Sequence, residues 1–210
     1  MIIAIDGPAA AGKGTLARQL AVHFDLALLD TGLIYRAVGM NLMNAGADLE
    51  DANVALKAAL NLKSEDLKAT DLRTDIAADA ASRISAVPEV RSALIDFQRS
   101  FAENPPEGKN GSVLDGRDIG TIVCPEANVK LFITAGPEVR AERRYLELRE
   151  RKHDAIYSRV LADMKERDER DSVRTVSPLV PAKDAFFLDT SVLAATEVFS
   201  MALDFINKNH

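Results

Sequence analysis

Between a short apolar run and an amphipathic segment, the chain reads Gly7-Pro8-Ala9-Ala10-Ala11-Gly12-Lys13-Gly14-Thr15. Residues 2–5 have the composition of a buried strand, and residues 15–24 have the apolar spacing of a helix. This order of strand, glycine-bounded loop and helix matches the phosphate-binding pattern G-x-x-x-x-G-K, in which backbone N–H groups and a helix N-terminus converge on one small volume. We therefore predict that the loop, together with Lys13 and Thr15, binds the phosphate groups of a nucleotide.

The same stretch allows two other interpretations. Gly12, Gly14 and Ala17 also match the dinucleotide-binding fingerprint, and Asp30 lies at a suitable distance to contact a ribose. In that fingerprint, however, the first glycine directly follows the strand, and a lysine inside it has no explanation. A purely structural glycine turn would not require Lys-Gly-Thr after a buried strand. Phosphate binding is therefore the favoured interpretation.

The composition is that of an ordinary globular protein, with 210 residues, 47% hydrophobic and 28% charged, enough for one domain with inserted pieces. No apolar run approaches the roughly 20 residues of a membrane span, and no basic leader precedes the first strand. We expect a cytoplasmic, monomeric protein without a membrane partner. Cys124 is the only cysteine, which excludes an internal disulfide and predicts a small buried apolar side chain.

Charge is unevenly distributed along the chain. The formal net charge is −6, yet residues 138–174 hold 11 Lys and Arg against 10 Asp and Glu. A net negative protein does not attract extended polyanions such as nucleic acid. The positive groups are therefore predicted to bind a small anion in a pocket.

Four further apolar runs, at residues 26–29, 112–115, 129–133 and 186–189, predict short buried strands, with helices between and after them. The ends of such strands open onto the ligand crevice of an α/β sheet, so polar residues that follow them are candidates for ligand contact. Thr31 and Arg36 follow the second strand. Thr31 also fits a helix N-cap, and the two roles are compatible.

A long segment without a strand pattern separates the second and third strands. Apolar spacing predicts helices over residues 49–60, 72–85 and 88–102, with Pro88 at a helix start. So long an excursion in a compact domain is usually functional. Arginines recur in it at positions 83, 91 and 99, and each taken alone is typical of a solvated surface side chain.

Asp115-Gly116-Arg117-Asp118 closes the third strand. A carboxylate there suits the orientation of Mg²⁺-bound waters or a sugar or base edge, and an arginine suits bidentate binding of a phosphate. A structural ion pair between Arg117 and Asp118 is the alternative.

Residues 151–174 are densely charged. Asp163, Arg167, Asp171 and Arg174 follow one another at helical spacing. They indicate either a solvated series of i,i+4 ion pairs or a mobile lid that carries arginines to the phosphates, and the spacing is compatible with both.

From the first strand to Asp189 the chain resembles the bacterial cytidylate kinases, a family of P-loop nucleoside monophosphate kinases. The resemblance is carried by Ile5-Asp6-Gly7-Pro8 with Gly12-Lys13-Gly14-Thr15, by residues 30–36 (DTGLIYR), by residues 114–121 (LDGRDIGT), by Glu166-Arg167-Asp168 through Asp171, and by Ser177-Pro178-Leu179. It implies a three-layer α/β sandwich with a five-stranded parallel sheet as core (residues 1–47, 105–150 and 175–210). It also implies a helical insertion that binds the monophosphate (48–104) and a helical lid (151–174).

The resemblance further implies an enzyme of pyrimidine metabolism that uses ATP and Mg²⁺ to phosphorylate CMP and also dCMP. By this resemblance Lys13, Arg117 and Arg167 are catalytic, and Arg36 and Arg117 hold the monophosphate. The cytosine end is assigned to Thr31, Ser82, Arg91, Asp118 and Arg174, and the sugar to Arg167 and Asp171. It leaves the direct Mg²⁺ ligands open.

Two other functions remain as alternatives. A P-loop kinase of another small acceptor, such as UMP or a shikimate-like metabolite, would share the loop and the strands. A GTP-dependent switch would need an N-K-x-D or T-K-x-D sequence to read its base, and the chain has neither.

Overall fold

The computed structural model describes residues 1–63, 65–106, 108–173 and 177–209. Its centre is a five-stranded sheet with the strand order β2-β3-β1-β4-β5, in which every pair of neighbours is parallel. The strands are β1 (Ile2–Asp6), β2 (Ala27–Asp30), β3 (Ser112–Gly116), β4 (Val129–Thr134) and β5 (Phe186–Asp189). The predicted sheet is confirmed, and its parallel strands place all five carboxyl ends at one edge.

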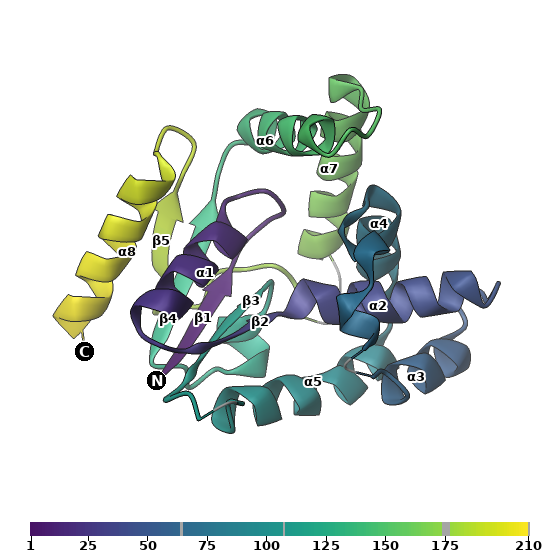
Figure 1. Ribbon diagram of the computed structural model, residues 1–210, viewed down its shortest axis with the longest axis horizontal. Coiled ribbons are helices and arrows are strands. Elements are labelled where there is room, and N and C mark those ends of the chain that lie inside the picture. The colour runs from purple at the N-terminus through teal and green to yellow at the C-terminus, as the bar shows by residue number, and fades with distance from the viewer. Residues whose placement is uncertain (64, 107, 174–176, 210) are drawn as a thin grey trace.

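Helices cover both faces of the sheet (Figure 1). Helices α1 (Lys13–His23) and α8 (Ala195–Asn209) pack on the face that carries Ile3 and Ile5 of β1. Helices α2 (Thr31–Asn44) and α5 (Pro88–Glu103) pack on the face that carries Ala4. Because successive side chains of a strand point to opposite faces, β1 contributes to both layers of the core. Cys124 is buried on the second face, as predicted.

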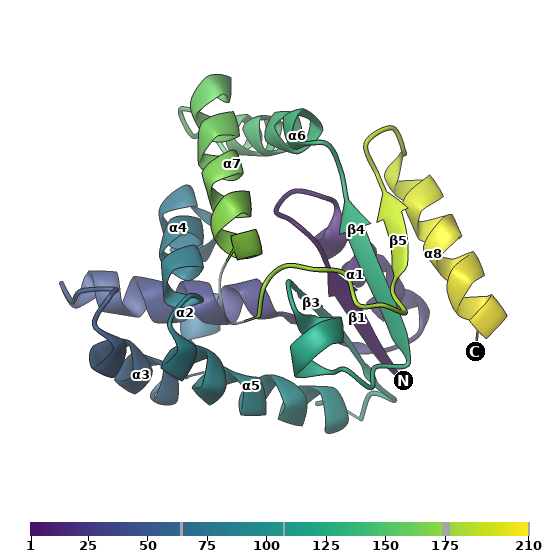
Figure 2. The same ribbon diagram turned by 180° about the vertical axis from the view of Figure 1, so that it is seen from behind.

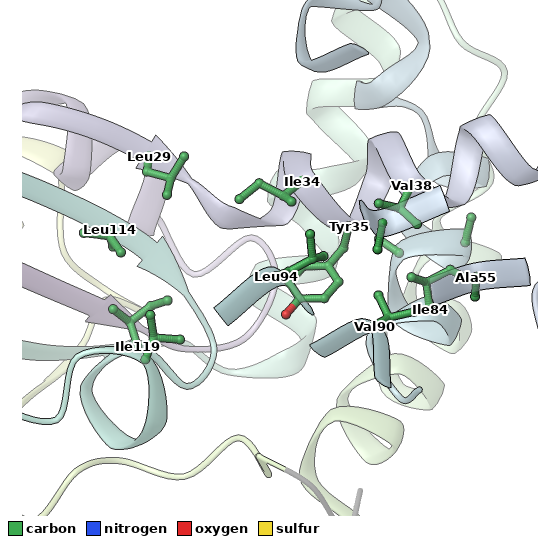
Figure 3. Packing of buried hydrophobic residues seen from close by; sticks show 14 of the residues in the cluster. Leu29, Ile34, Tyr35, Val38, Ala55, Ile84, Val90, Leu94, Leu114 and Ile119 are labelled. Carbon is green, nitrogen blue, oxygen red and sulfur yellow. The ribbon is translucent and has the colours of Figure 1, made fainter. Parts of the chain in front are cut away.

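The described residues between α2 and β3 form helices and turns and no strand. They comprise α3 (Ala52–Leu60), the short turns Asp66–Lys68 and Thr70–Arg73, α4 (Asp75–Ile84) and α5. Two helices begin three residues later than predicted, because Asp51 and Thr74 cap their first N–H groups with a side-chain oxygen. Figure 3 shows one continuous apolar cluster, from Leu114 and Ile119 at the sheet to Ala55 and Ile84 in these helices.

Helices α6 (Pro137–Glu150) and α7 (Tyr157–Val173) form a hairpin beyond the carboxyl ends of the strands, with α7 beside α4 (Figures 1 and 2). The small apolar cluster of the hairpin also contacts Ala9 and Ala10 of the glycine-bounded loop. A single π-helical turn, Ile119–Val123, follows β3 and was not predicted from the sequence. Within the described part of the chain, no helix has the length and apolarity needed to cross a membrane.

Candidate functional site

The loop after β1 has a backbone conformation that favours glycine at two positions. Gly7 has a φ of 145°, and a Cβ atom at this position would lie 1.9 Å from the carbonyl oxygen of Ile133 on β4. Gly12 has a φ of 97° and directly precedes α1, which begins at Lys13. The first N–H groups of α1 therefore face the loop, as anion binding at a helix N-terminus requires.

Lys13 is buried beside this loop. Its Nζ donates a hydrogen bond to the carbonyl oxygen of Pro8 at 2.9 Å and lies 3.7 Å from Oδ1 of Asp115. Burial, followed by repulsion from Arg117, lowers the pKa of Lys13 to about 8. The ammonium group is thus short of negative charge, and an anion bound in the loop would stabilise its protonated form.

Gly14 explains why the loop ends in Lys-Gly-Thr. A Cβ atom there would lie 3.3 Å from Oδ2 of Asp115, so a side chain would crowd this carboxylate where β3 meets α1. Burial raises the pKa of the Asp115 carboxyl, Lys13 opposes this rise, and the charge of Asp30 adds to it. The site therefore places two neighbouring carboxylates, those of Asp115 and Asp30, next to the phosphate loop.

The lowered pKa of Lys13 leads to a measurable proton exchange. Binding of a triphosphate should restore the protonated ammonium, so ATP binding should take up protons from solution above pH 8, approaching about one proton by pH 9. For the same reason, ATP affinity should weaken as the pH rises through 8. Titration calorimetry in buffers of different ionisation enthalpy measures the uptake, which a Lys13→Met variant should lack. Equal heats in all buffers at pH 8.5 would contradict the assignment.

A second group of charges lies between β3 and α7. Nε of Arg117 donates to Oδ2 of Asp171 at 3.0 Å, and Nε of Arg167 lies 3.9 Å from the same oxygen. Burial and then repulsion from Arg117 lower the pKa of Arg167 to about 9. Among the described residues, Arg167 Nε has no hydrogen-bond partner although the atom is buried.

These contacts correct two of the alternatives derived from the sequence. Arg117 pairs with Asp171, whereas Asp118 pairs with Arg91, so the ion pair between Arg117 and Asp118 is wrong. Asp171 is only 4% exposed, so the charges of α7 are not simply a solvated series. The helix was predicted correctly from its spacing, but the spacing gave no sign that Asp171 pairs with Arg117, which directly follows β3.

Four cations, Lys13, Arg36, Arg117 and Arg167, repel one another where these groups meet. The carboxylates that offset this repulsion are those of Asp30, Asp115, Asp168 and Asp171. Arg36 itself donates to the carbonyl oxygen of Leu72 at 2.8 Å, and burial lowers its pKa. Cations that are crowded together and have strongly lowered pKa values, as Lys13 and Arg167 have, mark a candidate site for an anionic ligand.

Arg91 and Asp118 form a buried ion pair. A cavity of about 550 Å³ is lined by Ser82, Pro88 and Asp171 among others, and Arg91 and Asp118 are not among its lining residues. Arg91 also donates to the carbonyl oxygen of Ser85 at 3.1 Å, and its guanidinium lies 5.5 Å from the centre of the Tyr35 ring. Arg91 is 2% exposed, so its interpretation as a solvated side chain is wrong. Ser82 borders the cavity, and within the described chain its buried Oγ has no partner.

Thr31 is the first residue of α2, and Asp30 occupies the N-cap position. The Thr31 hydroxyl donates to the carbonyl oxygen of Asp115 at 2.8 Å, so the N-cap role is wrong. Gly116 leaves room for this hydroxyl, since a Cβ atom there would lie 2.7 Å from Thr31 Oγ1. Arg174 lies outside the described residues.

A second cavity, of about 250 Å³, lies beside the loop. It is lined by Gly12 of the loop, by Thr15 and Gln19 of α1, by Arg143, and by Thr190 and Leu193 after β5. Sequence reasoning did not single out Arg143 or Thr190. The guanidinium of Arg143 donates to Thr190 Oγ1 at 2.9 Å, and the Thr190 hydroxyl donates to the carbonyl oxygen of Ala11, also at 2.9 Å. The position of Thr190 directly after a buried strand was the signal that could have found it.

Comparison with known proteins agrees with this geometry. The family model described as Cytidylate kinase matches residues 3–208. The chain is 64% identical over 205 residues to a cytidylate kinase of Paramagnetospirillum magneticum, covering 98% of this chain and 97% of that protein. It is 57% identical over 206 residues to a cytidylate kinase of Rhodospirillum rubrum, covering 98% and 97% respectively.

A solved structure of an uncharacterized protein from Eubacterium ventriosum is similar in fold. It superimposes with a TM-score of 0.56 at 16% identity, covering 99% of this chain and 98% of that one. The fold, the arrangement of the loop and the family match over nearly the whole chain lead to one conclusion: the chain belongs to the cytidylate kinase family.

Proposed function

We propose that the protein transfers the γ-phosphoryl group of ATP to CMP, giving CDP and ADP. The observation that carries this proposal is a group of cations at the carboxyl edge of the sheet, the buried Lys13 and the half-buried Arg117 and Arg167. The 250 Å³ cavity is lined by Gly12, which directly precedes Lys13. The 550 Å³ cavity is lined by Asp171, the partner of Arg117. Two nucleotides bound in these cavities would bring their phosphates to the cations between them.

The donor is proposed to bind along α1. Backbone N–H groups of residues 7–15 and the ammonium of Lys13 hold the β- and γ-phosphates. The 250 Å³ cavity continues from Gly12 and Thr15 towards Leu193, Ala195 and Val198, and this apolar end suits the nucleoside of ATP. Arg143 closes the same cavity on the side of α6.

Mg²⁺ fits the oxygen atoms next to this loop. The Thr15 hydroxyl and the Asp115 carboxylate would hold it, with Asp30 paired beside Asp115 in the register of β2 and β3. No three His, Cys, Asp or Glu side chains of the described residues gather to bind a metal alone, which suits an ion that keeps its waters and the substrate's phosphates. When bound, Mg²⁺ neutralises charge on the transferred phosphoryl group.

The acceptor is proposed to bind in the 550 Å³ cavity, which Ser82 and Asp171 line, and to extend from it to the neighbouring charged residues. Its phosphate would bind to Arg36 and Arg117, and its sugar would contact Arg167 and Asp171. The base edge is assigned to Thr31, Ser82, Arg91, Asp118 and Arg174. The Ser82 hydroxyl, which has no hydrogen-bond partner among the described residues, supports this assignment, because a buried polar atom without a partner costs stability that a ligand can restore.

Catalysis in this arrangement needs no general base. The attacking oxygen belongs to a phosphate that is already anionic near neutral pH, so the reaction depends on alignment and on charge neutralisation. Lys13, Arg117 and Arg167 supply that neutralisation where the phosphoryl group passes from donor to acceptor.

We further propose that residues 48–104 act as the acceptor-binding insertion and residues 151–174 as the lid. Arg144 and Arg170 of the α6–α7 hairpin contact Asp75 and Asp79 of α4 at 2.5 and 2.8 Å. Such contacts between hairpin and insertion would exclude water from the bound phosphates. Both nucleotides are intracellular metabolites, so we place the reaction, by a monomeric enzyme, in the cytoplasm.

A panel of acceptors tests the proposal directly. With ATP and Mg²⁺, CMP and dCMP should give the highest kcat/KM, and AMP and GMP should be at least about a hundredfold lower, because a base-reading site leaves its polar groups unpaired with the wrong base. A coupled assay for ADP formation measures each rate. Preference for UMP, for shikimate or for a nucleoside would replace CMP as the acceptor.

A further inference from the structure

The π-helical turn Ile119–Val123 is held at both of its ends by charged side chains. At its start, the carboxylate of Asp6 accepts hydrogen bonds from the backbone N–H groups of Ile119 and Gly120, both at 2.8 Å. At its end, Arg99 donates to the carbonyl oxygens of Ile122 and Val123, both at 2.9 Å. A negative group at the start of a helical turn and a positive group at its end both match the backbone dipoles.

Asp6 reaches this turn because of its place on β1. Its side chain points to the same face of the sheet as Ala4, and the turn covers that face. Asp6 is 3% exposed, and burial raises its pKa to about 6. Gly120 permits the contact, since a Cβ atom there would lie 3.3 Å from Oδ2 of Asp6. Two backbone donors thus stabilise a buried carboxylate that is costly to leave unpaired.

Arg99 reaches the turn from α5, the helix that also carries Arg91. The two arginines are eight residues apart, which separates them by about 80° around the helix, and Arg91 is buried whereas Arg99 is exposed. Arg91 binds the Asp118 side chain directly, and Asp118 is the residue that immediately precedes the turn. Asp118 is therefore restrained through its side chain by α5 and through its backbone by Asp6.

We propose that Asp6 is a positioning residue for acceptor recognition, fixing Asp118 through the turn, with Arg99 as a second, weaker support. This inference rests on the proposed function, in which Asp118 and Arg91 face the base of the acceptor. Asp6 directly precedes Gly7, so one residue of β1 links the strand of the donor loop to the group that reads the acceptor. Neither Asp6 nor Arg99 touches a substrate in this arrangement.

The test compares acceptor and donor kinetics in Asp6→Asn. The amide keeps the shape of the side chain but can accept with only one of its two polar atoms, so one backbone N–H of the turn loses its partner. We expect the KM for CMP to rise about tenfold, and the KM for ATP to stay within about twofold of the wild-type value. The preference for CMP over UMP should fall as well. That ratio does not depend on how much of the enzyme is folded.

Arg99→Met provides the second variant, because Arg99 is exposed and its loss should not prevent folding. It should shift the same two quantities, the KM for CMP and the CMP/UMP ratio, by about threefold. Asp96→Asn, an exposed acid on the same helix, is the control and should change neither. Asp118→Asn should change both strongly.

The outcomes separate the two levels of the proposal. If Asp118→Asn raises the KM for CMP but Asp6→Asn and Arg99→Met do not, the positioning role is wrong and the acceptor site stands. If Asp118→Asn leaves the KM for CMP unchanged, the acceptor site itself is misassigned, and the positioning role is overturned with it. Should Asp6→Asn fail to fold, the Arg99→Met result decides between support and rejection.

Discussion

Replacing Lys13 with methionine should lower kcat about a hundredfold to a thousandfold, the cost typical of removing one group that stabilises the transition state. Methionine keeps most of the apolar stem of lysine and removes the ammonium group, with its charge and its hydrogen bond to the carbonyl oxygen of Pro8. Its charge is held close to Arg117 and Arg167, and burial already lowers the pKa of Lys13 to about 8. The protein should therefore still fold, and the loss should appear in phosphoryl transfer measured by a coupled ADP assay.

Lys109→Met is the matched control for this prediction. Lys109 also forms an ion pair, with Asp25 at 2.5 Å, but at the surface and away from the loop. Its replacement should leave kcat within about twofold, since exposed ion pairs contribute little. Circular dichroism melting curves check that both variants fold. A folded Lys13→Met protein with near-normal turnover would remove the loop from the mechanism.

Replacing Gly7 with alanine should destabilise the protein by about 4 kcal/mol or more, at the upper end of single substitutions. The new Cβ atom would lie 1.9 Å from the carbonyl oxygen of Ile133, and that oxygen belongs to the backbone of β4 and cannot move aside. The φ of 145° at this position adds strain for any side chain. Urea denaturation followed by circular dichroism measures the free energy of unfolding.

Gly46→Ala is the control that separates backbone strain from the steric clash with β4. Gly46 also has a positive φ, 65°, but a Cβ atom there would meet nothing within 4 Å. Only the backbone penalty of about 1–2 kcal/mol should appear. Equal losses in the two variants would show that the close approach of β4 to the loop is not what requires Gly7.

Local patterns predicted the strands, the loop and the order of the helices correctly. A buried strand, a glycine-bounded loop and a helix are each encoded within about ten residues, and their spacing is visible in the chain. The family resemblance likewise depends on short motifs. The late starts of α3 and α4 show the limit of this approach, because Asp51 and Thr74 cap those helices through side-chain contacts that apolar spacing does not report.

The partners of the charged residues could not be predicted in the same way. Asp171 pairs with Arg117, and Asp118 pairs with Arg91, across 54 and 27 residues of sequence. Apolar spacing and short motifs give no measure of the distance between side chains on separate elements. Neighbouring charges such as Arg117 and Asp118 therefore looked like a pair although each points to a different helix.

By itself, the sequence determined the class of fold and the kind of ligand, because the Gly7–Thr15 loop must follow a strand and begin a helix to work. The tertiary structure alone decided which cations share a site, how far burial lowers the pKa of Lys13 and Arg167, and that Asp6 holds the turn beside Asp118. The physical reason is that electrostatic energies depend on distance and burial, and both are set only when distant segments pack together.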